Sequence, residues 1–124
     1  MQKARAFCFA CAGLLGLALL LPRPAAAAWP SDPLVNVPLC TATGSQGTPT
    51  IVADGAGGTI VTWSEYRSGS LDIYVQRISA GGIAQWTTNG VVLCTANGDR
   101  NSCAITSDGA SGAIVTWVDL RSGA

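Results

Sequence analysis

The chain has 124 residues, with 7 Lys and Arg, 7 Asp and Glu and no His, so its formal net charge at pH 7 is 0. Beyond residue 28 the balance becomes four Arg against seven acidic residues. This leaves no basic patch or stripe for a nucleic-acid partner. The absence of His removes the most frequent general base and metal ligand. We therefore expect neither a nucleic-acid partner nor a cofactor.

The N-terminal segment is typical of a secretory signal peptide. Two basic residues precede an apolar run of 15 residues (7–21), which is shorter than the about 20 residues of a membrane-spanning helix. Four alanines (25–28) then offer a small-residue cleavage site. We expect residues 1–28 to be removed. The mature chain would then be secreted, periplasmic or at the cell surface, with no membrane segment.

Short strand-like runs follow a lead-in at 29–36, and glycine-rich turns separate them. No window of 11 or more residues after the leader shows helical periodicity. The runs are rich in β-branched and aromatic residues, as strands are. We expect strands at 50–53, 59–66 and 72–78, with 83–86 and 91–94 completing the unit.

The sequence repeats itself with a period of 54 residues. Residues 37–70 align with 91–124 without a gap, and 18 of the 34 positions are identical. A fixed period of this size indicates a repeat architecture, in which one unit cannot bury its own apolar face. We divide the mature chain into a lead-in, a first unit (37–90) and a truncated second unit (91–124). We expect a fragment of a longer protein, and assembly with copies of itself is the alternative.

The predicted fold class is all-β, with tandem four-stranded antiparallel propeller-like blades that are incomplete at about two units. Three or four short strands per period are typical of a propeller blade. A single β-sandwich of about seven strands fits the strand count but does not explain the repeat. A parallel β-solenoid is the third alternative, and its coils are usually shorter.

One block of sequence resembles a known family. Residues 54–69 read Asp-Gly-Ala-Gly-Gly-Thr-Ile-Val-Thr-Trp-Ser-Glu-Tyr-Arg-Ser-Gly, and Asp-Ile-Tyr-Val-Gln-Arg follows at 72–77. This pattern resembles the tandem repeats of large secreted bacterial β-propeller-like proteins, over residues 37–124. It is more distantly similar to sialidase-type propellers with Asp-box repeats. In the Asp-box pattern the Asp lies five positions before the Trp, whereas in each unit of this chain it lies nine positions before the Trp. The resemblance implies an architecture and says almost nothing about activity.

A Trp-x-acidic-x-Arg motif occurs in both units. Its copies are Trp63, Glu65 and Arg67, and Trp117, Asp119 and Arg121. Alternate residues of a strand share a face, so the three side chains point the same way. They could form an ion pair beside the Trp or an anion-binding site. A fold determinant is needed in every unit and a catalytic group only once, so we predict a structural motif.

An Asp-Gly pair opens a glycine-rich turn in each unit, at Asp54 and Gly55 and at Asp108 and Gly109. Calcium takes 6–8 oxygen ligands, and each loop offers one carboxylate. We therefore expect no metal site, but an Asp that accepts backbone N–H bonds. No His stands ready to activate a nucleophile, and no G-x-S-x-G elbow is present. We predict no catalytic or cofactor-binding residue.

Three cysteines follow the leader, at Cys40, Cys94 and Cys103. An exported protein meets an oxidising compartment, where disulfides form. A Cys94–Cys103 disulfide is one hypothesis that the spacing allows, because these residues flank a short loop. Cys40 would then remain as a small buried hydrophobe.

Two functions fit these features. The first is an exported non-enzymatic scaffold that binds a protein or carbohydrate ligand, with further repeat units or copies of itself as partners. The alternative is the N-terminal portion of a secreted, glycosidase-like hydrolase whose catalytic residues lie beyond Ala124. More near-identical units would favour the scaffold, and a distinct domain with acidic and His residues would favour the enzyme.

Overall fold

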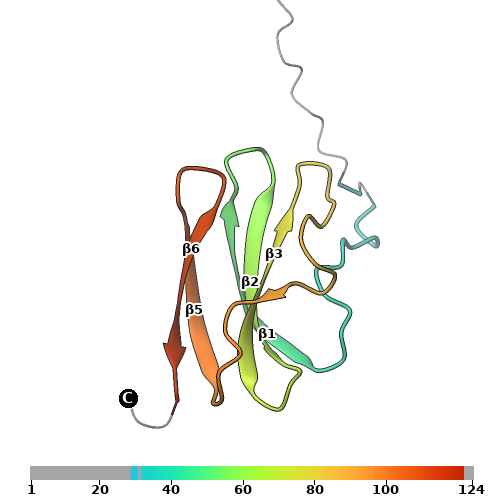
Figure 1. Cartoon of the computed structure of the whole chain (residues 1–124). Coiled ribbons are helices and arrows are strands. Elements are labelled where there is room, and N and C mark those ends of the chain that lie inside the picture. Colours follow the sequence, from blue (N-terminus) through green and yellow to red (C-terminus); the bar gives the residue numbers. More distant parts are fainter. Residues whose placement is uncertain (1–28, 31, 122–124) are drawn as a thin grey trace, which may run out of the picture.

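The computed structural model describes residues 29–30 and 32–121, and strands are the only long regular elements of this part. They form an antiparallel four-stranded sheet, β1-β2-β3-β4, and a two-stranded sheet, β5-β6 (Figure 1). The elements are β1 (Ser45–Ala53), β2 (Thr59–Tyr66), β3 (Leu71–Ile78), β4 (Val91–Val92), β5 (Arg100–Ser107) and β6 (Ala113–Asp119). The predicted all-β class is confirmed. The predicted leader (1–28) and the end of the second unit (122–124) lie outside the described residues.

The central pair of strands is β2 and β3. They pair without a register shift, from Thr59 opposite Ile78 to Tyr66 opposite Leu71. Residues 60–65 of β2 are all buried, although they alternate between the two faces of the sheet. Both faces of β2 are therefore covered, which explains why its sequence is dense in β-branched and aromatic residues.

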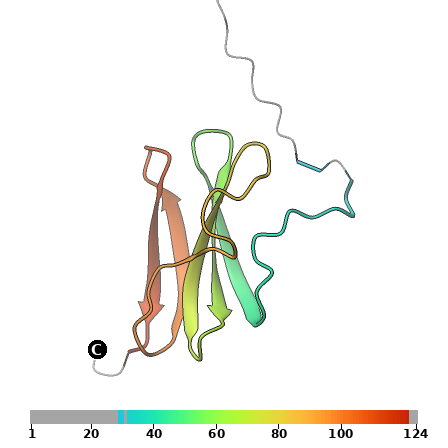
Figure 2. The same ribbon diagram turned by 45° about the vertical axis from the view of Figure 1, so that its right-hand side comes forward.

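Different parts of the chain cover the two faces of the four-stranded sheet. Strand β5 lies against β1, β2 and β3 on one face, and its Cys103 sulfur is 3.5 Å from Thr62 Oγ1 of β2. On the other face, Val61, Trp63 and Tyr74 form a buried cluster with residues 39–40 and with β4. Figures 1 and 2 show the β5–β6 hairpin and the segment before β1 on opposite sides of the sheet.

The β1–β2 and β5–β6 hairpins have the same register when residue numbers are shifted by 54. Ile51 pairs with Val61 in the first hairpin, and Ile105 pairs with Val115 in the second. Both ladders are also interrupted at equivalent places, at 47–50 and 101–104.

A residue with positive φ lies within each interruption. Thr48 has a φ of 47° and Ser102 a φ of 52°. This conformation is uncommon for residues other than Gly, and particularly for a β-branched one. Such irregularities bend a strand and increase its twist. The two hairpins therefore share a strained position as well as a register.

The last strand of the four-stranded sheet is shorter than the sequence predicts. Only Val91 and Val92 pair with β3, and the segment 83–86 makes a single bridge, from Ala84 to Ile78. Two backbone hydrogen bonds flank this bridge, from Ser79 N to Ile83 O at 2.9 Å and from Gln85 N to Arg77 O at 2.8 Å. The next N–H, of Trp86, donates to Gln76 Oε1 at 2.9 Å instead of to the backbone of β3. Within residues 29–30 and 32–121, no helix is long and apolar enough to cross a membrane.

Candidate functional site: the Glu65 carboxylate and the neighbouring hollow

The carboxylate of Glu65, near the end of β2, is enclosed by donors. Its Oε1 accepts hydrogen bonds from Gln46 Nε2 at 3.0 Å and Arg67 Nε at 2.9 Å. Its Oε2 accepts from Trp63 Nε1 at 2.8 Å and Arg67 Nη2 at 2.7 Å. Glu65 itself is fully buried. The three residues of the first Trp-x-acidic-x-Arg motif are therefore brought together, with Trp63 and Arg67 both bound to the carboxylate.

The guanidinium of Arg67 is also held by groups outside the motif. Its Nη2 donates to the Asn89 carbonyl at 3.0 Å and contacts the Cys40 sulfur at 3.3 Å. The guanidinium carbon lies 4.1 Å from the centre of the Tyr74 ring, which stacks on Trp63 at 6.1 Å. The cation therefore lies over Tyr74, and Trp63 acts on the carboxylate through its N–H.

The electrostatics of this cluster keep Glu65 ionised. Burial would raise its pKa, but the hydrogen bonds from Arg67, Trp63 and Gln46 outweigh burial and lower the pKa to about 2. The hydrogen bond to Glu65 in turn raises the pKa of Arg67. A general acid or base works best with a pKa near the operating pH. Glu65 is far from that condition at neutral pH.

The second Trp-x-acidic-x-Arg motif forms the same ion pair in a more open setting. Arg121 Nη2 lies 2.9 Å from Asp119 Oδ2, and the Arg121 side chain is 56% exposed. Burial opposes ionisation of Asp119, but the hydrogen bond from Arg121 leaves the pKa of Asp119 lowered. Trp117 is half-buried on the same strand. The pairing of the acid with the Arg is thus common to both units, and the degree of enclosure is not.

A buried ion pair between the two sheets was not predicted from the sequence. Arg100, at the start of β5, is fully buried, and its Nη1 lies 2.6 Å from Asp72 Oδ1 of β3. Its guanidinium also donates to the Ala96 carbonyl. Position 100 is equivalent to Gln46 in the first unit. The repeat therefore gave no signal for this pair.

Asp54 organises the β1–β2 turn. Its Oδ1 accepts the backbone N–H groups of Ala56 and Gly58, both at 2.8 Å, and Arg77 Nε donates to Oδ2 at 2.9 Å. The pKa of Asp54 is lowered, with the Ala56 N–H as the largest cause. Gly55, next to it, has a φ of 74°, which suits Gly better than residues with a Cβ.

Asp108 repeats this arrangement in the β5–β6 turn. Its Oδ1 accepts the N–H groups of Ala110 at 2.7 Å and Gly112 at 2.9 Å. These bonds lower the pKa of Asp108, again with the first of them as the largest cause. Gly109 has a φ of 78°. The Asp-Gly pairs therefore sit at equivalent turns with the same backbone contacts.

Cys40, Cys94 and Cys103 are all free in this structure, and the hypothesised Cys94–Cys103 disulfide is not formed in it. Cys103 is buried between the two sheets, where its sulfur lies 3.7 Å from Thr50 Oγ1 and 3.5 Å from Thr62 Oγ1. Packing against β1 and β2 therefore directs this side chain toward the first sheet.

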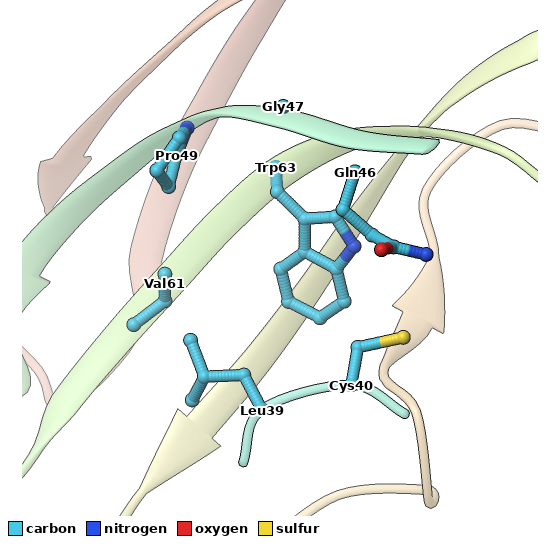
Figure 3. Close-up of a pocket in the computed structure, with 7 residues that line it drawn as sticks. All are labelled: Leu39, Cys40, Gln46, Gly47, Pro49, Val61 and Trp63. Carbon is cyan, nitrogen blue, oxygen red and sulfur yellow. The ribbon is translucent and has the colours of Figure 1, made fainter. Parts of the chain in front are cut away.

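A hollow of about 280 Å³ lies beside the Glu65 cluster. Figure 3 shows the Trp63 indole at its centre, with Pro49, Val61 and Leu39 around it. The lining residues are Leu39, Cys40, Gln46, Gly47, Pro49, Val61 and Trp63, none of which is charged. The hollow can hold an apolar group, and the Glu65 carboxylate next to it is already occupied by its own donors.

Within the described ranges, no group of three His, Cys, Asp or Glu side chains is arranged to hold a metal ion. Comparisons of the chain with family models, curated proteins and solved structures gave no match.

Proposed function

We propose that this chain is an exported repeat protein whose propeller-like units stack sheet on sheet, and that it acts as a non-enzymatic binding scaffold. The observation that carries the proposal is the closure of the recurring charged motif within its own unit. Glu65 accepts four N–H hydrogen bonds from Gln46, Trp63 and Arg67. A scaffold needs such a contact in each unit, whereas a catalytic group needs free atoms directed at a substrate.

The backbone supports the division into units. The two hairpins share their register, their ladder interruption and their positive-φ residue at a spacing of 54. The second hairpin also packs on the face of the first sheet, as neighbouring blades of a propeller do. Propellers typically contain about 4–8 blades. We therefore expect a complete assembly to need further units or copies of this chain.

The hollow beside Trp63 supports a binding role. It has about 280 Å³ and an uncharged lining, which is at or below the roughly 300–1,000 Å³ of typical small-molecule sites. That size suits an apolar side chain of a protein partner better than a cofactor. A carbohydrate that stacks a sugar face on the Trp63 indole is the other ligand class to test.

The stacking of the units can be tested with a cross-link. Thr62 Oγ1 lies 3.5 Å from the Cys103 sulfur, so a Thr62→Cys variant should form a disulfide with Cys103 in an oxidising compartment. The matched control is Thr116→Cys, at the equivalent position of β6, where the side chain is exposed. Peptide mapping of the exported product should find the cross-link only in Thr62→Cys. Free Cys103 in that variant would contradict the stacking.

The export part of the proposal has its own measurement. The intact mass of the product recovered outside the cytoplasm should correspond to a chain that begins at Trp29. A product that keeps residues 1–28 would contradict removal of the leader.

A further inference from the structure

One face of β2 is covered by the second hairpin, and the equivalent face of β6 is not. Ile60 and Thr62 are both 0% exposed, and Thr62 contacts Cys103 of β5. The residues 54 positions later are Ile114 and Thr116. Ile114 is 57% exposed, and Thr116 is exposed as well. The structure therefore contains a covered and an uncovered version of one surface.

We call the uncovered version the outer face and define it by Ala104, Ile114, Thr116 and Val118. Val118 is 47% exposed and stands where β2 has Ser64. Ala104 stands where β1 has a threonine. The outer face is thus more apolar than the surface that β5 covers, although it is open to solvent.

The opposite side of the molecule carries a second surface, which is open at Pro49 and Ile51 and which we call the hollow face: Leu39, Pro49, Ile51 and the buried Val61. Ile51 is 67% exposed and Pro49 is exposed. The residues equivalent to Ile51 and Pro49 are Ile105 and Cys103. Ile105 is half-buried and Cys103 is 8% exposed, because β5 lies against the first sheet.

We infer that the outer face of one copy of this chain docks on the hollow face of a second copy, an inference that rests on the proposed stacking of units. The internal contact between the sheets is the template. In the new contact Thr116 takes the place of Thr62, and Pro49 of the second copy takes the place of Cys103. Ile114 is identical to its template residue Ile60.

The chemistry of the two faces indicates the character of this contact. Neither face contains a charged residue, so apolar burial drives the association and added salt changes it little. The buried Arg100–Asp72 pair of the internal contact has no counterpart, because Gln46 stands in the place of Arg100. We therefore expect the contact between copies to be weaker than the contact within one copy.

The geometry of the contact is head-to-tail. Two different faces meet, so each copy keeps one face free after pairing. Such heterologous contacts generate closed rings or open filaments, whereas a two-fold dimer uses the same patch twice.

The test is sedimentation of the exported chain over a rising concentration range. The wild type should shift from monomer to oligomers larger than a dimer. Thr116→Lys blocks the outer face and Ile51→Lys blocks the hollow face, so each should remain monomeric. Ala110→Lys, at the exposed tip of the β5–β6 turn, is the control and should assemble like the wild type. Circular dichroism should show that all three variants keep the wild-type fold.

Mixing the two blocked variants tests the head-to-tail direction. Thr116→Lys retains a hollow face and Ile51→Lys retains an outer face, so an equimolar mixture should form one-to-one dimers and nothing larger. A wild type that stays monomeric at every concentration overturns the inference, as does dimer formation by either blocked variant alone. Running the Thr62→Cys cross-link on the same chain separates the two proposals. A monomer with the cross-link overturns only this inference, and a missing cross-link overturns the stacking of units.

Discussion

Arg67 and Arg121 occupy the same position of the two units, but they differ in enclosure. Arg67 lies against Tyr74 and pairs with a fully buried carboxylate, with 27% of its side chain exposed. Arg121 is 56% exposed. Surface ion pairs contribute little to stability because solvent screens them. The same motif should therefore stabilise the first unit more than the second.

Arg67→Gln is expected to lower the free energy of unfolding by about 2 kcal/mol, less than the roughly 3–5 kcal/mol of a fully buried pair because Arg67 is partly exposed. Urea unfolding measures the change. Arg121→Gln is the matched control and should leave the urea midpoint unchanged. Equal effects of the two substitutions would contradict the difference in enclosure. An unchanged stability of Arg67→Gln would instead favour an anion-binding role for this Arg.

The low pKa of Glu65 makes stability depend on acid. In the folded chain this pKa is about 2, against an ordinary value of 4.5. The unfolded chain therefore binds a proton first as the pH falls. The stabilisation is fully present above pH 4.5 and is lost as the pH falls from there toward about 2. Urea midpoints measured from neutral pH down to about pH 3 should fall. Glu65→Gln should reduce that dependence, and an unchanged dependence in the variant would assign it to other carboxylates.

At the scale of elements, the two Asp-Gly turns differ by one partner. Asp54 and Asp108 each accept two backbone N–H groups, but only Asp54 also has a bond to Arg77 among the contacts of the two turns. We expect Asp54→Ala to lower the urea midpoint more than Asp108→Ala, because it also leaves the Arg77 guanidinium without its carboxylate. A larger effect at Asp108 would show that the Arg77 bond adds nothing.

The strands were predictable where local composition determines them. They were less predictable where the backbone conformation or the side chain of one residue determines where a strand begins or ends. The run of β-branched and aromatic residues at 59–66 matches β2, but β1 begins at Ser45, five residues before the predicted start at Thr50. The positive φ of Thr48 lets the ladder continue past an interruption that a simple alternation pattern does not reveal. Likewise, the segment 83–86 makes one bridge to Ile78 instead of the expected strand, and the Trp86 N–H donates to the Gln76 side chain.

The candidate site follows the same division. The pairing of Glu65 with Arg67 was expected from their spacing on one strand face, because that spacing is local. The contributions of Gln46 and Asn89 come from other segments of the chain. Such contacts depend on how loops and strands pack, and the sequence pattern carries no information about that.

At the scale of the whole molecule, the Arg100–Asp72 pair joins the two sheets. Both side chains are buried, with Arg100 0% and Asp72 3% exposed. Removing one partner of such a pair leaves an uncompensated buried charge, whereas replacing both with apolar groups is often neutral or stabilising. The pair should therefore control whether the sheets unfold together.

Asp72→Asn is expected to lower the free energy of unfolding by about 2 kcal/mol, because it removes the nearest carboxylate of the buried Arg100. The loss is below the roughly 3–5 kcal/mol of a pair with a single acid, since Asp119 Oδ2 stays 3.8 Å from Arg100 Nε. It should also loosen the β5–β6 hairpin and speed alkylation of Cys103, which lies buried between the sheets. Urea unfolding measures the change in free energy, and mass spectrometry of the labelled chain measures the rate of Cys103 alkylation. The double variant Asp72→Asn with Arg100→Met removes the buried cation as well, so it should regain stability and restore slow alkylation. If Asp72→Asn leaves Cys103 as protected as in the wild type, this pair does not hold the sheets together, and apolar packing between β5 and the first sheet is sufficient.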